Sequence, residues 1–323
     1  MLQFSREMFR DMKLSENPLV SIVIPSFNQG QFIGETIESI LSQNYRPLEV
    51  IVMDGASTDE TLSVLDGYRN CSEMRVWSEP DKGVVDAVNK GLREARGAIW
   101  AIQSSDDTYL PGAIEAAVEA LRANPKAGLA FGDVELIDEN SRLVGSDLLG
   151  AFVMAEYLGR LTYIPQPSAF FRAEAGRAVG NWRPEVSYCP DADYWIRIAL
   201  RYEVTKIDRV IARYRYHPAQ RDKHQDRILR DWERMISDLK SEPNMTPELT
   251  RYASMGVHLA RYRYTAEDRW LARTLHLYRA ALANPAAVAH RHFPKREMLP
   301  GRKPIWAALS HVKRLLGFRP RGQ

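Results

Sequence analysis

The 323-residue chain is 45% apolar and 26% charged, with 19 glycines and 18 prolines. These values exclude a collagen-like, low-complexity or wholly disordered protein. Its two cysteines, Cys71 and Cys189, are too few for a disulfide framework or a cysteine-rich zinc site, so a reducing compartment is expected. The N-terminus has no signal-peptide pattern and no apolar stretch is long enough to span a membrane, which predicts a cytoplasmic protein.

The charge is unevenly distributed along the chain. The formal net charge is +3, but residues 290–323 carry nine lysines and arginines against Glu297 alone, so the remainder is net negative. The basic character therefore belongs to the C-terminal end. The body shows no broad cationic surface of the kind that binds nucleic acid.

Short β-branched runs alternate with amphipathic helical patterns over the first 132 residues, which predicts an α/β fold with a mainly parallel sheet. The expected strands cover 19–25, 48–53, 74–77, 98–103 and 127–132. Four helices are expected between these strands. The first has an apolar face formed by Ile33, Ile37, Ile40 and Leu41, and the second begins with a capping box of Ser57 and Glu60. The other two cover 84–96 and 111–123.

After residue 133 the pattern changes to short strand-like pieces separated by turns. A strand is expected at 168–172, a helix at 191–202 and a pair of strands ending at Tyr216. From about Asp226 the sequence is helical in pattern. We expect an N-terminal arm over 1–17, an α/β domain over 18–225 divided at residue 132, and a helical, basic extension over 226–323.

The C-terminal extension contains a second amphipathic pattern. Ile305, Leu309, Val312 and Leu316 share one helical face, with Lys313 and Arg314 off it. A basic amphipathic helix can lie on the surface of an anionic membrane, here the inner face of the plasma membrane. The same stripe can also pack on the body or form a homodimer, and the sequence leaves these alternatives open.

Acidic residues follow three of the expected strands or precede the next helix. They are Asp54, Asp81 and the pair Asp106-Asp107. Because ligands of open α/β sheets bind at the carboxyl ends of the strands, these carboxylates are expected to converge. Converging carboxylates need a cation or a hydrogen-bonding partner, and a divalent metal that carries a diphosphate meets this need. Adjacent residues on an extended backbone point in opposite directions, so Asp106 and Asp107 can divide the two tasks.

Structural explanations compete with this interpretation. Asp54-Gly55 is a common turn pair, whereas helix capping explains Asp106-Asp107 poorly. The loop after the first strand has no G-x-G-x-x-G, and the chain has neither a P-loop nor a G-x-S-x-G elbow. The dehydrogenase, P-loop and hydrolase interpretations therefore lose their main support.

Four ordered blocks of this sequence resemble those of the family 2 glycosyltransferases. The blocks are VSIVIPSFNQGQFIGETIESILSQ, VIVMDGASTDET, SEPDKGVVDAVNKGL and IQSSDDTYLPGA. The resemblance covers about residues 18–217 and implies the GT-A fold with inverting, non-processive transfer. It also implies that 18–132 is the half that binds a nucleotide sugar and that 133–225 is the acceptor half.

The resemblance carries over to individual residues of the first half. It implies that Pro25, Ser26 and Phe27 line the nucleotide base and that Asp54 contacts the base region. Asp81 and Lys82 are implied to lie beside the nucleotide. Of the acidic pair, Asp106 is implied to bind the nucleotide sugar and Asp107 to be the metal ligand. Many members have a second Asp where this chain has Gly55.

In the second half, the segment YCPDADYWIRIAL resembles the family's E-D-x-D-x-W block, with Pro190 in place of the Glu. The resemblance implies that Asp191 is the general base, with Asp193 as a secondary candidate for a catalytic role. It further implies that Gln166 and Trp195 lie near the acceptor and that His217 faces the phosphates or metal. The competing explanation for the two acids is that they favour a helix N-terminus.

The predicted function is inverting transfer of a sugar from a nucleotide-diphosphate sugar, with a UDP-sugar favoured, to the hydroxyl of a carbohydrate or lipid-linked acceptor. Oxygen ligands suit Mn²⁺ or Mg²⁺, and cell-surface polysaccharide or glycolipid synthesis is the expected setting. The alternatives are a nucleotidyltransferase, which would be expected to have a basic loop where this chain has PSFNQGQ, and a non-catalytic adaptor that binds nucleotide sugars.

Overall fold

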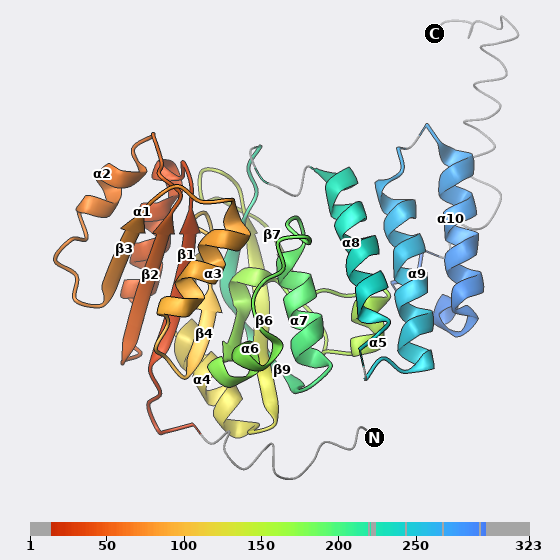
Figure 1. Ribbon diagram of the computed structural model, residues 1–323, viewed down its shortest axis with the longest axis horizontal. Helices are drawn as coiled ribbons and strands as arrows, with labels where there is room; N and C mark the ends of the chain where they lie inside the picture. Colours follow the sequence, from red (N-terminus) through yellow and green to blue (C-terminus); the bar gives the residue numbers. More distant parts are fainter. Residues whose placement is uncertain are drawn as a thin grey trace, which may run out of the picture.

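The computed structural model describes residues 14–218, 220, 224–242, 244–266, 268–290 and 292–294. One nine-stranded sheet runs through the body in the order β3-β2-β1-β4-β8-β6-β9-β5, with β7 paired to β6. Helices cover both faces of the sheet, and three more helices extend beyond it toward one end of the molecule (Figure 1).

The first four strands are parallel, as predicted. They are β1 (Val20–Ser26), β2 (Leu48–Asp54), β3 (Met74–Ser78) and β4 (Ile99–Ile102). β1, β2 and β4 consist almost wholly of buried residues because both faces of the sheet are covered. Their register aligns Ser26 with Asp54 and Asp54 with Ser78, so polar residues end three neighbouring strands at one edge.

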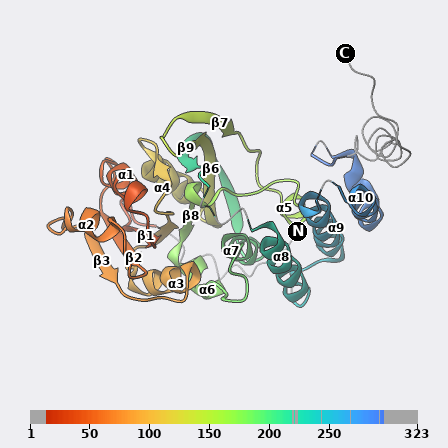
Figure 2. The same cartoon turned by 90° about the horizontal axis from the view of Figure 1, so that it is seen from above.

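Two hydrophobic cores lie on opposite faces of this sheet. The helices concerned are α1 (Gly30–Leu41), α2 (Thr61–Asp66), α3 (Val84–Glu94) and α4 (Ala113–Ala123). Figure 2 shows α1 and α4 on one face and α3 on the other, and the apolar side chains of α1 and α4 form one core while those of α3 join the other. Ile33, Ile37 and Ile40 are fully buried, which confirms the predicted apolar face.

The predicted capping box is wrong. The α2 helix begins at Thr61 without a side-chain cap, and the hydroxyl of Ser57 donates to Asp54 while accepting from the backbone N–H of Asn28. Ser57 therefore stabilises the loop after β2 because a strand-end carboxylate competes for its hydroxyl.

The second half of the sheet is mixed rather than mainly parallel. Its strands are β5 (Thr108–Tyr109), β6 (Ala127–Ile137), β7 (Leu143–Asp147), β8 (Ala169–Arg172) and β9 (Glu203–Arg215). β8 is antiparallel to both β4 and β6, and β9 is one long strand instead of the expected pair. Register shifts between β6 and β9 interrupt their pairing, which accounts for the broken pattern in the sequence.

The remaining helices surround this mixed half and extend from it. They are α5 (Met154–Leu158), the 3-10 turn η1 (Gln166–Ser168), α6 (Ala173–Val179), α7 (Pro190–Ala199), α8 (Gln225–Leu239), α9 (Pro247–Tyr264), α10 (Trp270–Ala283) and the 3-10 turn η3 (Pro285–Ala289). Trp232 and Met235 of α8 belong to the same core as Trp195 of α7. The predicted division near residue 225 is thus a change in composition across which packing continues.

Within the described ranges, no helix has both the length and the apolar character needed to cross a bilayer. The predicted N-terminal arm falls almost entirely outside the described residues, and so does the amphipathic stripe from Ile305 to Leu316.

Candidate functional site

A cavity of about 730 Å³ lies where the carboxyl ends of β1, β2 and β4 face the first turn of α7. This volume is in the range that holds a cofactor-sized ligand. The sequence-predicted residues that line it are Pro25, Ser26, Phe27, Asp81, Asp106, Asp107, Gln166, Asp191 and His217. Residues separated by up to 192 positions in the chain therefore share one site, as the strand-end argument predicted.

Asp54 does not line this cavity. Its carboxylate is buried and accepts hydrogen bonds from the backbone N–H of Ser57 at 3.0 Å, from the hydroxyl of Ser57, and from the hydroxyl of Ser78 at 2.6 Å. Both oxygens are thus engaged by the scaffold. Asp54 ties the end of β2 to β3 and shapes the loop, rather than contacting the cavity directly.

The carboxylate that reaches the cavity beside β2 belongs to Asp81. One of its oxygens accepts from the backbone N–H of Gly83 at 2.7 Å, and a Cβ placed on Gly55 would lie 2.6 Å from the other oxygen. The glycine at position 55 therefore makes room for Asp81. Lys82 is exposed and does not line the cavity, although its backbone N–H bonds Asp86.

Asp106 and Asp107 point to different partners. Asp106 Oδ2 lies 2.9 Å from Nε2 of His217 at the cavity. Asp107 is 1% exposed and its Oδ1 accepts the backbone N–H of Arg215 at 2.8 Å. Burial, together with the neighbouring charge of Asp106, raises the pKa of the Asp107 carboxyl well above its usual range.

Arg215 holds this acidic loop in place. Its buried guanidinium donates to the carbonyl of Asp106 at 2.7 Å, to the hydroxyl of Ser141 at 2.8 Å and to the carboxylate of Glu35 at 2.6 Å. It also lies over the ring of Phe32, 4.9 Å from the centroid. Arg215 thereby joins β9, α1 and the β6–β7 turn around the loop that presents Asp106.

Asp191 and Asp193 have different surroundings. Asp191 lies in the first turn of α7 and lines the cavity. Asp193 is fully buried and pairs with two arginines: it accepts from Nε of Arg197 at 2.9 Å and from Nε of Arg183 at 3.1 Å. Asp193 does not line the cavity, so its position is structural.

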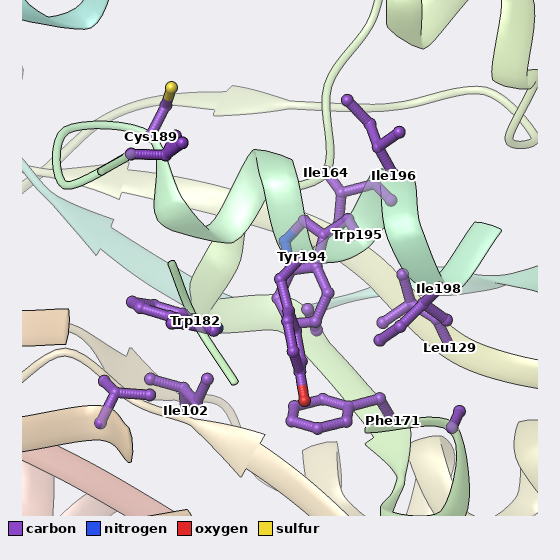
Figure 3. Close-up of a cluster of buried hydrophobic side chains, with 14 of the residues drawn as sticks. Ile102, Leu129, Ile164, Phe171, Trp182, Cys189, Tyr194, Trp195, Ile196 and Ile198 are labelled. Carbon is purple, nitrogen blue, oxygen red and sulfur yellow. The ribbon is translucent and has the colours of Figure 1, made fainter. Parts of the chain in front are cut away.

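Trp195 was expected near the acceptor, but the structure places it in the hydrophobic core. It is fully buried and packs edge-on against Phe171 and Tyr194, with ring centroids 5.4 and 5.7 Å apart. Figure 3 shows these side chains together beneath α7. The position falls on the inner face of the helix, so the indole supports the α7 backbone from below.

Gln166 does line the cavity, and its side chain braces two segments. Its Oε1 accepts the hydroxyl of Ser104 at 2.8 Å, and its amide nitrogen donates to the carbonyl of Ile102. Gln166 therefore fixes η1 against the end of β4.

Several lining residues were not found by sequence reasoning. They are Gln29, Gly55, Gly83, Val84, Ala87, Ile102, Ser104, Ser105, Trp182, Tyr188, Pro190, Tyr214, Gln220 and Ile228. The backbone N–H of Tyr188 donates to Asp231 of α8 at 2.7 Å, so the first helix of the extension helps to build the wall. The clustering of tryptophan and tyrosine just before the 190–195 block was the available signal.

No three or more His, Cys, Asp or Glu side chains form a ready metal cluster in the part of the chain that the structure describes. Four aspartates line the cavity, and among them Asp106 lies 2.9 Å from an imidazole nitrogen, Nε2 of His217. Two protein ligands fit a divalent ion that completes its coordination with substrate phosphates and water.

Comparison with known proteins agrees with this architecture. The family described as "Glycosyl transferase family 2" matches residues 21–196. An uncharacterised glycosyltransferase of Mycobacterium tuberculosis is 29% identical over 207 residues, which cover 62% of this chain and 76% of that protein. Chondroitin synthase of Escherichia coli is 28% identical over 195 residues, 60% of this chain but only 28% of the synthase.

Two solved structures share the fold. S. aureus TarS (residues 1–349) in complex with UDP-GlcNAc aligns with a TM-score of 0.63 at 15% identity, covering 86% of this chain and 82% of that 1–349 chain. A mannosyltransferase from Pyrobaculum calidifontis, in complex with GDP-Man and Mn²⁺, aligns with a TM-score of 0.61 at 22% identity, covering 95% and 82%. These likenesses confirm a GT-A-like fold. Because the family match spans more than half of the chain, the protein belongs to glycosyl transferase family 2 and is a transferase enzyme.

Proposed function

We propose that this enzyme transfers a sugar from a nucleotide-diphosphate sugar to an acceptor hydroxyl with inversion at the anomeric carbon. The observation that carries the proposal is that Asp106, His217 and Asp191 line one cavity, although they come from three separate segments. The donor loops lie at the strand ends, and Asp191 faces the same space from α7.

Two buried polar atoms support a nucleotide at the strand ends. Among the described residues, the Oγ of Ser26 and the Oε1 of Gln29 have no hydrogen-bond partner, and both residues line the cavity. A buried polar group without a partner costs free energy unless a ligand or water satisfies it. Phe27, which is 58% exposed, offers an apolar ring beside them on which a base can stack.

We propose that Asp106 and His217, rather than Asp107, hold the divalent metal. All three residues line the cavity, and the geometry supports the exchange of roles because Asp107 is buried with one oxygen bonded to β9, whereas Asp106 Oδ2 already lies beside the imidazole of His217. Bound there, Mn²⁺ or Mg²⁺ would act as a Lewis acid that neutralises the charge of the departing nucleoside diphosphate.

Asp191 is the proposed general base. The acceptor hydroxyl must lose its proton as its oxygen attacks the anomeric carbon, and a carboxylate within about 3 Å can accept that proton. A single base on the face opposite the leaving group is sufficient for inversion. Trp182 and Tyr188 line the same cavity as Asp191 and offer aromatic surfaces to a sugar. We propose a carbohydrate or lipid-linked acceptor, as in cell-surface polysaccharide or glycolipid synthesis.

A panel of nucleotide sugars, with UDP-sugars first, tests the donor class. We expect slow hydrolysis of one or a few donors, dependent on Mn²⁺ or Mg²⁺, with release of the nucleoside diphosphate. ¹H NMR of the first transferred sugar then reports its anomeric configuration. Retention of configuration, or turnover unaffected by EDTA, would contradict the proposal.

A further inference from the structure

The outermost helix, α10, has an exposed apolar stripe. Leu271, Leu275 and Leu282 are 67%, 49% and 78% exposed, and Tyr278 between them is 43% exposed. The spacings of four, three and four residues place all of them on one side of the helix. Exposed leucines are common singly, but a line of them along a whole helix marks an interaction surface.

The opposite side of α10 is the side that packs. Leu277 and Ala280 are fully buried in a small core that α10 shares with Met255 and Leu259 of α9. Figures 1 and 2 both show α10 at the end of the molecule, with α9 between it and the rest of the body. The leucine stripe therefore faces outward from the end of the molecule and does not belong to the core.

The charged residues of α10 itself are all basic. From Arg269, which precedes the helix, to its last residue Ala283 the sequence contains three arginines and no aspartate or glutamate, and Asp268 lies just before them. Arg269 and Arg279 are exposed at α10 itself, and Trp270 begins the helix. Exposed leucines with flanking arginines, Trp and Tyr form the pattern of a helix that lies in the headgroup region of an anionic bilayer.

A second copy of the chain fits this surface less well. The stripe is about 18 Å long and about 10 Å wide, far below the roughly 800 Å² that each partner buries in a stable dimer. A twofold contact would also bring like-charged arginines together. The leucines protrude from a convex helix, and a bilayer can accept such a shape without a complementary groove.

We propose that α10 is a membrane-surface anchor, which inserts Leu271, Leu275 and Leu282 among anionic lipids. This surface is separate from the cavity, because none of the three leucines lines it. It would hold the enzyme at a lipid surface whichever donor the cavity accepts.

Vesicle flotation of the full chain tests the anchor. The probes are vesicles of phosphatidylcholine alone and of phosphatidylcholine with about 30% phosphatidylglycerol. We expect the wild type to float with the anionic vesicles, and the triple variant Leu271→Gln, Leu275→Gln, Leu282→Gln to bind them at least about tenfold more weakly.

A matched control replaces three exposed leucines on other elements by glutamine, namely Leu62, Leu143 and Leu148, and should float like the wild type. Circular dichroism and the melting temperature verify that both variants fold. Flotation of the α10 variant at the wild-type level, or no flotation of the wild type, would overturn the proposal. So would a wild-type dimer that the α10 variant abolishes in the absence of lipid binding.

Discussion

The loop after β4 and the first turn of α7 face each other across the cavity, and each carries a pair of acids. The two members of each pair are held differently. Asp106 and Asp107 both line the cavity, but Asp107 is bonded to β9; Asp191 lines the cavity and Asp193 does not. The two anchors differ in origin. Asp107 is held by a backbone N–H on β9, 108 residues away, whereas Asp193 is held by arginines on its own helix and ten residues upstream.

Residue type alone therefore does not show which carboxylate of such a pair is held by the scaffold. Asp106 lies in a turn and Asp191 in the first turn of a helix, and in both places the neighbouring acid has different partners. In each pair one member, Asp106 or Asp191, is proposed to act on the substrate from the cavity lining. Its neighbour stabilises the backbone that presents it, and substitutions should therefore affect the two members in different ways.

The largest effect is expected at Asp191. Asp191→Asn keeps the shape of the side chain but removes the proton acceptor, so transfer should fall by roughly 10²–10⁴-fold while donor binding is retained. Single-turnover transfer and calorimetric donor binding measure the two quantities. Asp208→Asn, at an exposed position on β9, is the control, and near-wild-type transfer by Asp191→Asn would remove it as the base.

The next comparison is between Asp106→Asn and Asp107→Asn. We expect the first to lower Mn²⁺-dependent affinity for the donor nucleotide by more than about 100-fold, since even partners behind a metal ligand are worth about 10–100-fold. In Asp107→Asn the side-chain oxygen can still accept the backbone N–H of Arg215. The affinity of this variant for the donor nucleotide should therefore stay within about tenfold of wild type. The reverse order in titration calorimetry would restore Asp107 as the metal ligand.

A smaller effect on turnover, but a clear one on stability, is expected for Asp193→Asn. It leaves Arg183 and Arg197 without their buried anion, which should lower the free energy of unfolding by about 3 kcal/mol. Turnover per folded molecule should change little. The matched control is Asp238→Asn, because the ion pair of Asp238 with Arg183 is more exposed. It should lower the free energy of unfolding by less than about 1 kcal/mol. Denaturant unfolding measures both, and equal losses would contradict the buried-anchor interpretation.

The smallest effect concerns pH and the C-terminal helices. Burial and neighbouring arginines lower the pKa values of His258 on α9 and His276 on α10, whose rings stack 6.1 Å apart. Below about pH 6.5 the unfolded chain therefore binds more protons at these histidines than the folded chain does. The stability of the α9–α10 helix pair should fall as the pH drops through that value. Hydrogen exchange of α9 and α10 at pH 7 and pH 5 should show the loss, and His276→Gln should reduce it. Unchanged protection at pH 5 would show that the pair contributes nothing.

Much of the first half of the sheet could be predicted because its signals are local. Runs of apolar residues such as those of β1 and β2 specify buried parallel strands, and the polar residues that follow them specify the edge where ligands bind. The position of Asp191 at the start of a helix was predicted for the same reason. The mixed part of the sheet was harder to predict because β9 pairs with β6 through shifted registers.

The amino-acid sequence by itself determined which segments become strands and helices, which acids stand at their ends and, through its ordered blocks, the family. Only the tertiary structure decided that Asp107 is bonded to β9 while Asp106 lies beside His217, that Asp193 lies away from the cavity, that Trp195 packs in the core, and that Arg215 holds the acidic loop. The reason is physical: hydrogen-bond partners such as Asp107 with Arg215, or Asp106 with His217, become neighbours only when strands distant in sequence pair. Periodicity reports the burial of a side chain and carries no information about which distant group it will meet.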